Sequence, residues 1–215
     1  YFEPAHTISP VKFMDYTLGI SICEDIWNDE EFWTRPLYEV DPIENLISNG
    51  ANLIINISSS PFAVGKHDKI RLRMLTHDAV KYKVPFIYVN QVGGNDDLVF
   101  DGNSTVINAQ GVLIAQAAAF EEDLMIVDLE NPAVHVSPRS CDPVETIHKA
   151  LLVGLQDYVK KCGFKKVVIG LSGGIDSAVT AALAVQALGS DNVIGVLMPS
   201  QFSSQGSIDD AVKLA

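Results

Sequence analysis

The sequence of 215 residues contains only three cysteines, and no two of them are close enough to form a C-x-x-C pair. An odd number of widely spaced thiols excludes a disulfide framework and a zinc or dithiol motif. We therefore expect a reducing, cytoplasmic location, and we expect Cys141 and Cys162 to be inert. No apolar run approaches the ~18 residues of a membrane span, and no signal sequence opens the chain, so no membrane partner is predicted.

A basic patch and clustered histidines are also lacking. Residues 1–143 contain 21 acidic and 9 basic residues and account for the net charge of −12, since the remainder contains 6 of each. Binding of nucleic acid generally requires a stripe of Lys and Arg, so no nucleic-acid partner is predicted. The five histidines form no H-x-x-H pair, which argues against metal ligation by imidazole. A hydrophobic fraction of 47% predicts a globular core.

The most informative motif is a glycine-rich turn between two apolar segments. G-L-S-G-G-I-D-S occupies residues 170–177, after a β-branched run and before an apolar run with helical spacing. The pattern predicts a strand over 167–171, buried on both faces, a helix over 175–188 and a second, parallel strand over 193–198. The predicted buried face of the helix comprises Ile175, Ala178, Val179, Ala182 and Leu183.

This turn has the chemistry of a phosphate-binding loop. The first N–H groups of a helix lack intrahelical partners and bind anions well. Gly173 and Gly174 allow the backbone to approach phosphate oxygens, and the hydroxyls of Ser172 and Ser177 add donors. A carboxylate beside a phosphate requires a cation between them. We therefore assign Asp176 to Mg²⁺, which binds both kinds of oxygen.

The same residues leave two alternatives to a phosphate-binding loop open. G-x-S-x-G also matches the nucleophile elbow of a serine hydrolase, with Ser172 as the nucleophile. That triad places its histidine after the serine, whereas the last histidine of this sequence is His148. The other alternative is a glycine-rich turn that binds no ligand. A Walker A loop is excluded because the turn has no lysine.

A second candidate site lies where the apolar run L-G-I-S-I ends on Cys23. A thiol at the end of a strand, where the chain turns sharply, is accessible to substrate, and nearby backbone N–H groups can stabilise a developing oxyanion. Cysteine is also strongly nucleophilic once it is ionised. The alternative is a buried structural cysteine.

Both motifs resemble segments of known families. S-G-G-I-D-S resembles the pyrophosphatase-type loop of adenylating ATP-dependent amidotransferases, and residues 193–211 are similar to the segment after that loop in NAD synthetases. C-E-D-I-W, at residues 23–27, resembles the nucleophile motif in the nitrilase-like glutaminase domain of glutamine-dependent NAD synthetases. Residues 56–66 and 88–102 are similar to two further segments of that domain, so the resemblance covers nearly the whole sequence.

The resemblance implies two coupled reactions. Cys23 attacks the amide of L-glutamine, which Ser60 and Lys66 bind, and ammonia is released. ATP adenylates deamido-NAD, and ammonia then converts the activated carboxylate into the amide of NAD⁺, with release of AMP and pyrophosphate. Another adenylating glutamine amidotransferase is the alternative within this class. The resemblance also implies a homo-oligomer and an ATP and Mg²⁺ site formed by Gly170, Leu171, Ser172, Gly173, Gly174, Ile175, Asp176 and Ser177.

The resemblance further implies that the sequence is an internal piece of a longer enzyme and is inactive by itself. In nitrilase-like enzymes the general base, a glutamate, and a lysine lie upstream of the nucleophile, and here both would precede Tyr1. The chain begins without Met, and the helical pattern that begins at Asp209 stops within about two turns.

The expected fold class is α/β, with the C-terminal part of an αββα nitrilase-like sandwich followed by the start of a Rossmann-like parallel α/β domain. Prolines between these parts predict a glutaminase domain over 1–130, a linker over 131–142 and an ATP-binding domain over 143–215. Further strands are predicted over 17–22, 53–57, 86–89, 104–108, 112–116 and 125–129, and helices over 43–48, 68–83 and 143–162. The predicted buried face of the last helix comprises Val144, Ile147, Leu151, Leu155, Tyr158, Val159 and Cys162.

Overall fold

The computed structural model describes residues 5, 7–29, 31–34, 39–130, 136 and 142–215. The chain divides into two compact units. The first consists of Tyr1–Val92 with Phe100–Pro143, and the second of Gly93–Val99 with Val144–Ala215. In the described ranges, no helix is both long and apolar enough to cross a membrane.

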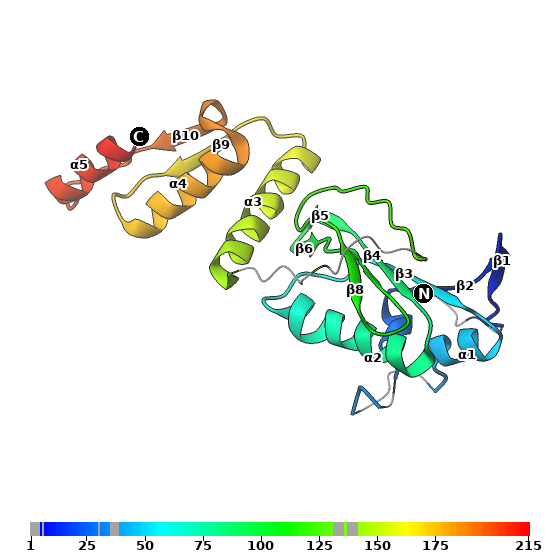
Figure 1. Ribbon diagram of the computed structural model, residues 1–215. Coiled ribbons are helices and arrows are strands. Elements are labelled where there is room, and N and C mark those ends of the chain that lie inside the picture. Colours follow the sequence, from blue (N-terminus) through cyan, green and yellow to red (C-terminus); the bar gives the residue numbers. More distant parts are fainter. Residues whose placement is uncertain (1–4, 6, 30, 35–38, 131–135, 137–141) are drawn as a thin grey trace. The chain divides into compact units, whose positions relative to one another are not determined.

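The first unit is built on a mixed sheet in the order β1-β2-β3-β4-β7-β8 (Figure 1). The strands β2, β3 and β4 are parallel, and the pairs β1–β2, β4–β7 and β7–β8 are antiparallel. A separate two-stranded sheet, β5–β6, was not predicted. The bounds are β1 Val11–Phe13, β2 Tyr16–Ile22, β3 Leu53–Ser58, β4 Phe86–Asn90, β5 Val92–Asn95, β6 Leu98–Asp101, β7 Thr105–Ile107 and β8 Leu113–Gln116.

Two helices pack on this sheet. Helix α1, Pro42–Ser48, begins at Asp41, whose carboxylate accepts hydrogen bonds from two N–H groups of the first turn. The predicted helix over 68–83 is confirmed, but its first part is a π-helix, η2, His67–Arg71, followed by helix α2, Leu72–Tyr82. Their apolar side chains form the main core with side chains from the sheet and from two connections: Ile26, Ile43, Leu46, Ala51, Ile54, Leu72, Met74, Leu75, Ala79, Phe86, Tyr88, Ile107 and Leu113.

The opposite face of the sheet also carries apolar side chains, but they are exposed. Ile20 and Ile22 on β2, Ile57 on β3 and Val89 on β4 are each more than 40% exposed. Strand side chains alternate between faces, so these residues lie opposite the helix-covered core. The predicted αββα sandwich places its second sheet on such a face.

The strand predicted over 125–129 is wrong. This segment has no regular secondary structure, and it forms no ladder with any strand of the described residues. Met125, Val127 and Leu129 pack against a small cluster on β7 and β8, whereas Leu124 and Ile126 are more than 90% exposed. The alternation in the sequence therefore reflects one-sided packing without strand pairing.

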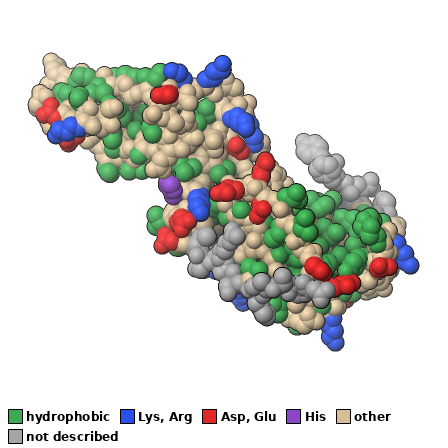
Figure 2. All heavy atoms as spheres, turned by 45° about the horizontal axis from the view of Figure 1, so that its top comes forward, with side chains coloured by type: hydrophobic (Ala, Val, Ile, Leu, Met, Phe, Trp, Pro, Cys, Tyr) green, Lys and Arg blue, Asp and Glu red, His purple; other side chains and the backbone are tan. Residues whose placement is uncertain are grey.

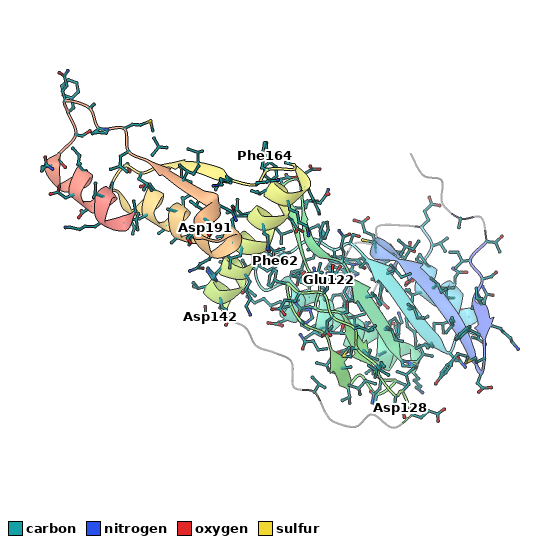
Figure 3. All side chains as sticks on the ribbon, turned by 90° about the horizontal axis from the view of Figure 1, so that it is seen from above. Phe62, Glu122, Asp128, Asp142, Phe164 and Asp191 are labelled. Carbon is teal, nitrogen blue, oxygen red and sulfur yellow. The ribbon has the colours of Figure 1, made fainter. Side chains whose placement is uncertain are left out.

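The second unit confirms the predicted strand–helix–strand arrangement. Strand β9, Val167–Gly170, pairs in parallel with β10, Val193–Val196, and helix α4, Ile175–Leu188, lies between them in the sequence. Helix α3 covers Pro143–Lys161 and α5 covers Gln205–Leu214. A short 3-10 helix, η3, Ser190–Asn192, follows α4 and contains Asp191, which is labelled in Figure 3.

The predicted burial in this unit is largely wrong. Val168 on β9 and Ile175 and Val179 on α4 are at least 50% exposed, and the fully buried residue of α4 is Ala184. On α3, most of the predicted apolar face is exposed, and Ala150 and Val159 are the buried residues. Periodicity identified the apolar stripes, but the described residues provide only a two-stranded sheet to cover them. Apolar side chains are accordingly visible on the surface in Figure 2.

One of the two predictions about the remaining cysteines is also tested by this arrangement. Cys162 was expected on a buried helix face, but it is exposed in the turn after α3. Cys141 lies outside the described residues.

Candidate functional site

The chain turns sharply at Cys23. Strand β2 ends at Ile22, and Cys23 begins the 3-10 helix η1, Cys23–Ile26, with a φ of 47°. A positive φ is unfavourable for a residue with a Cβ atom and is often associated with functional sites. The N–H of Ile22 donates to the Asp25 carboxylate at 2.7 Å, which stabilises the turn. The thiol is partly exposed, as predicted for a residue that meets substrate.

A buried amide supports this turn from the neighbouring strand. Asn56 lies on β3 opposite Ser21 and is fully buried. Its Nδ2 donates to the main-chain oxygen of Cys23 at 3.3 Å and to Ser21 Oγ at 3.0 Å. Its Oδ1 accepts from Ser58 Oγ at 2.6 Å. Sequence reasoning did not identify this role of Asn56, although a polar residue within L-I-I-N-I-S is a signal that could have been used.

The loop after β3 carries the two predicted glutamine-binding residues. Ser60 is buried, and its N–H donates to Asn90 Oδ1 at 2.9 Å. Lys66 Nζ donates to the main-chain oxygen of Pro61 at 3.1 Å and lies 5.1 Å from the centroid of the Trp27 ring. Trp27 directly follows η1, so the ring contact brings Lys66 to the segment that begins with Cys23.

The electrostatic surroundings of Lys66 agree with this placement. Burial lowers the pKa of the Lys66 ammonium, and the Arg71 charge lowers it further, against the opposing effects of Asp101, Cys23 and Glu24. The charged groups that act on Lys66 thus belong to the segment that begins with Cys23 as well as to Arg71 and Asp101.

A buried acidic cluster in the same unit was not visible in the sequence spacing. The potential ligand atoms of Asp29, His77 and Asp78 lie within 4.8 Å of one another. However, Lys81 Nζ donates to Asp29 Oδ2 at 2.7 Å, so an ammonium group already serves as a counter-ion. Burial, with the charges of Asp29 and Asp41, raises the pKa of Asp78 to about 8 against the opposing effect of Lys81.

The glycine-rich loop of the second unit is held by its own hydroxyl groups. The N–H of Ser172 donates to Ser177 Oγ at 3.2 Å, and the N–H of Gly174 donates to Ser172 Oγ at 3.2 Å. Ser177 Oγ in turn donates to the main-chain oxygen of Gly174 at 3.0 Å. The two serines thus shape the loop in addition to offering donors to a ligand.

Helix α4 begins directly after this loop. Its N-cap is Gly174, and no side chain caps the first turn, so its N–H groups are available to an anion. Asp176 lies exposed in that turn. An exposed carboxylate beside an uncapped helix start fits the predicted Mg²⁺ ligand, because a bound cation would offset its repulsion of phosphate.

The two glycines of the loop have different surroundings. Gly173 has a φ of +80°, and a Cβ atom there would lie 2.1 Å from the main-chain oxygen of Ser207. Gly173 is therefore required by its contact with α5, which sequence reasoning did not foresee. A Cβ atom on Gly174 would meet only Ser172 Oγ, at 3.4 Å, so space remains beside this glycine.

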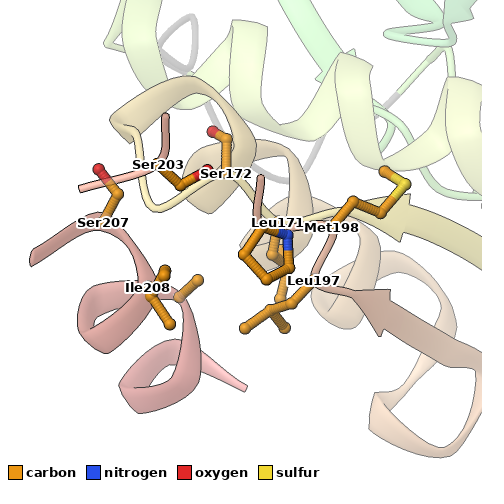
Figure 4. A pocket seen from close by; sticks show the side chains of 9 residues that line it. Leu171, Ser172, Leu197, Met198, Ser203, Ser207 and Ile208 are labelled. Atoms are coloured by element: carbon orange, nitrogen blue, oxygen red, sulfur yellow. The ribbon is translucent and has the colours of Figure 1, made fainter. Parts of the chain in front are cut away.

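A pocket opens next to the loop (Figure 4). Both apolar side chains and hydroxyl groups line it, and they come from the loop, from the segment after β10 and from α5. The lining residues are Leu171, Ser172, Leu197, Met198, Pro199, Ser203, Ser207, Ile208 and Ala211.

The fold and the cysteine turn define a class of protein. The carbon-nitrogen hydrolase family model matches residues 1–135, and the chain belongs to this family. The NAD synthase family model matches residues 147–215. Together with the α/β architecture, these matches confirm the predicted fold class.

Relatives of the chain align with both of the matched parts. The glutamine-dependent NAD(+) synthetase of Synechocystis sp. is 46% identical over 220 residues, which cover 100% of this chain and 39% of that protein. The enzyme of the same name from Thermotoga maritima is 41% identical over 252 residues, which cover 100% of this chain and 42% of that protein. The chain therefore spans about two fifths of the length of these relatives.

A solved structure shows the same similarity to a glutamine-dependent NAD+ synthetase. The glutamine-dependent NAD+ synthetase from Acinetobacter baumannii, in complex with ADP, is 36% identical and superposes with a TM-score of 0.85. The match covers 99% of this chain and 39% of that protein. The resemblance inferred from the sequence motifs is thus confirmed.

Proposed function

We propose that the complete protein is a glutamine-dependent NAD⁺ synthetase, in which Cys23 releases ammonia from glutamine and the loop at 170–177 binds ATP. The observation that carries the proposal is the left-handed turn at Cys23, where a partly exposed thiol stands at the end of β2. The matches to the carbon-nitrogen hydrolase and NAD synthase families on either side of residue 140 support it.

The glutaminase step uses the Cys23 thiolate as the nucleophile. Its sulfur forms a bond to the amide carbon of glutamine, and the carbon–nitrogen bond breaks. The departing nitrogen takes up the proton that the thiol gave up, so that ammonia is released and a glutamyl thioester remains. Water then hydrolyses the thioester and regenerates the thiol. Ser60 and Lys66 bind glutamine in this proposal, and the proximity of Lys66 to Trp27 supports that role.

The second step activates the carboxylate of deamido-NAD. A carboxylate is a poor electrophile, so transfer of AMP from ATP to its oxygen, with cleavage between the α and β phosphates and release of pyrophosphate, supplies a leaving group. Ammonia attacks the activated carbon, and AMP departs. The uncapped start of α4 supports phosphate binding by residues 170–177, and the ADP bound to the Acinetobacter baumannii relative supports use of an adenine nucleotide.

We assign the Mg²⁺ that accompanies ATP to Asp176. When bound, the ion would neutralise phosphate charge and orient the phosphate groups. Asp176 offers carboxylate oxygen, the ligand type that Mg²⁺ prefers, and its exposure in the first turn of α4 leaves it accessible.

The domain limits are part of the same proposal, with a glutaminase domain over 1–130, a linker over 131–142 and an ATP-binding domain over 143–215. A cytoplasmic location and a homo-oligomeric assembly stay predictions. The serine hydrolase alternative is not favoured by the contacts of Ser172, whose hydroxyl bonds to the N–H of Gly174 and to Ser177 Oγ.

The test compares two free cysteines in the complete protein, Cys23 and the exposed Cys162. We expect Cys23→Ala to abolish glutamine hydrolysis and glutamine-dependent NAD⁺ formation, while NAD⁺ formation from added ammonia continues. The control, Cys162→Ala, should retain all three activities. Glutamine-dependent synthesis at the wild-type rate in Cys23→Ala would refute the proposal.

A further inference from the structure

Arg71 is the largest fully buried side chain of the described residues. It is the last residue of the π-helix η2 and is 1% exposed. Its Nη1 donates to both carboxylate oxygens of Asp101, at 2.7 and 2.8 Å, and Asp101 is also buried. A buried arginine requires such a partner, because an unpaired charge in the interior is costly.

The other terminal nitrogen of the guanidinium group binds the loop that carries Ser60 and Lys66. Arg71 Nη2 donates to the main-chain oxygen of Ser60 at 2.8 Å and to that of Pro61 at 3.3 Å. Asn90 accepts from the N–H of Ser60. The peptide groups on both sides of Ser60 are thus held by side chains from other elements.

Lys66 shares one of these acceptors. Its Nζ donates to the main-chain oxygen of Pro61, to which Arg71 also donates. The position of the Lys66 ammonium therefore depends on where Arg71 holds Pro61. Loss of the guanidinium would free the Pro61 carbonyl to shift and carry Lys66 with it.

A chain of side chains fixes Asp101 in turn. Asn103 Nδ2 donates to Asp101 Oδ2 at 2.9 Å, and Asn103 Oδ1 accepts from Gln116 Nε2 at 3.2 Å. Gln116 Nε2 lies 3.0 Å from His67 Nε2, at the start of the same π-helix. The ion pair is thus oriented at Asp101 by Asn103 and at Arg71 by the carbonyls of the loop. Neutralisation of the two charges alone would not require these contacts.

We propose that Arg71 is a positioning residue for the glutaminase site, which sets the loop bearing Ser60 and Lys66 in the conformation that binds glutamine. This inference rests on the proposed function. Arg71 is buried behind the loop and acts through the carbonyls of Ser60 and Pro61. A purely structural ion pair would affect folding and leave the affinity of the folded enzyme for glutamine unchanged.

The first test uses Arg71→Lys in the complete protein. Lysine keeps the charge, but it lacks the planar guanidinium group that donates to Asp101 and to the two carbonyls at the same time. We expect the KM for glutamine to rise about tenfold or more, while ammonia-dependent NAD⁺ formation keeps its wild-type kcat and KM. The matched control is Arg73→Lys, at an exposed arginine on α2, and should retain the wild-type KM for glutamine.

A second variant covers the case in which Arg71→Lys fails to fold. Arg71→Met combined with Asp101→Leu removes both buried charges together, and such replacements commonly preserve folding. We expect the same rise in KM for glutamine with intact ammonia-dependent synthesis. A folded variant of either kind with the wild-type KM for glutamine would overturn the inference. Failure of the proposed function would instead show as retained glutamine-dependent synthesis in Cys23→Ala, which is independent of Arg71.

Discussion

The side-chain amide of Asn56 donates a hydrogen bond to the main-chain oxygen of Cys23 at 3.3 Å, across two neighbouring parallel strands. The acceptor belongs to a residue with a left-handed backbone, and such a conformation persists only where the surroundings stabilise it. Asn56 thus connects the interior of the sheet to the orientation of the nucleophile.

Leucine has nearly the same shape as asparagine but cannot donate this hydrogen bond. We therefore expect Asn56→Leu to lower the kcat for glutamine hydrolysis by about 10- to 100-fold, because a small displacement of a nucleophile has effects of this size. Steady-state glutaminase assays of the complete protein measure this change. Asn52→Leu is the control, since Asn52 is exposed and its Oδ1 accepts from the N–H of Thr17, away from Cys23. A folded Asn56→Leu variant with the wild-type kcat would contradict this role.

Substitution of Gly173 and Gly174 should distinguish the packing of the loop against α5 from its binding of ATP. Gly173→Ala should destabilise the second unit, because the new Cβ atom would lie 2.1 Å from the Ser207 carbonyl oxygen at a φ of +80°. Gly174→Ala should fold normally, since its nearest neighbour is 3.4 Å away, but it should raise the KM for ATP by narrowing the space beside the loop. Thermal unfolding and ATP titration of both variants measure the difference. Equal melting temperatures for the two variants would show that α5 does not require Gly173.

Removal of the Asp176 charge should affect only the ATP-dependent reaction. We expect Asp176→Asn to abolish amide formation from ATP and deamido-NAD, at any practicable Mg²⁺ concentration, and to leave glutamine hydrolysis measurable. Asp191→Asn is a matched control, because Asp191 is also exposed but lies in η3 beyond the other end of α4. Synthesis at the wild-type rate in Asp176→Asn would remove the magnesium assignment.

Asp78 should make the stability of the protein depend on pH. Burial raises its pKa from 3.8 to about 8, so between these values the folded state holds a proton that the unfolded state has lost. The free energy of unfolding should then fall as pH rises through this window, by up to about 1.4 kcal/mol per pH unit from this group. Urea unfolding at several pH values measures the slope.

Asp78→Asn should reduce this slope, because the amide does not titrate. Asp68→Asn provides the comparison, since Asp68 is exposed in the neighbouring π-helix. Identical slopes for the wild type and Asp78→Asn between pH 5 and about pH 8 would show that Asp78 does not hold a proton in the folded state.

Local patterns predicted most of the strands and helices, but they did not predict which side chains of the second unit are buried. The helix over 175–188 was predicted at its observed bounds, because an apolar stripe after a glycine-rich turn is a local signal. The prediction that Ile175 is buried was wrong, since burial depends on which other elements cover that face of the helix. The same reason explains the segment at 125–129, whose alternation predicted a strand although no strand in the described part of the chain pairs with it.

The candidate sites divide in the same way. Cys23 and residues 170–177 are recognisable in sequence because their chemistry depends on residues that are adjacent in the chain. The supports of these sites come from distant positions: Asn56 under Cys23, Arg71 and Asp101 behind the loop of Ser60, and Ser207 against Gly173. No spacing rule relates such residues, because the pairing of strands and the packing of helices bring them together.

By itself the sequence determined most of the strands and helices, the cysteine at the end of a strand and the glycine-rich turn before a helix, since each arises from local backbone preferences and side-chain chemistry. Only the tertiary structure decided which polar groups are buried and what they bind. Burial and long-range hydrogen bonding are properties of the assembled elements, and they determine how the nucleophile and the loops are held.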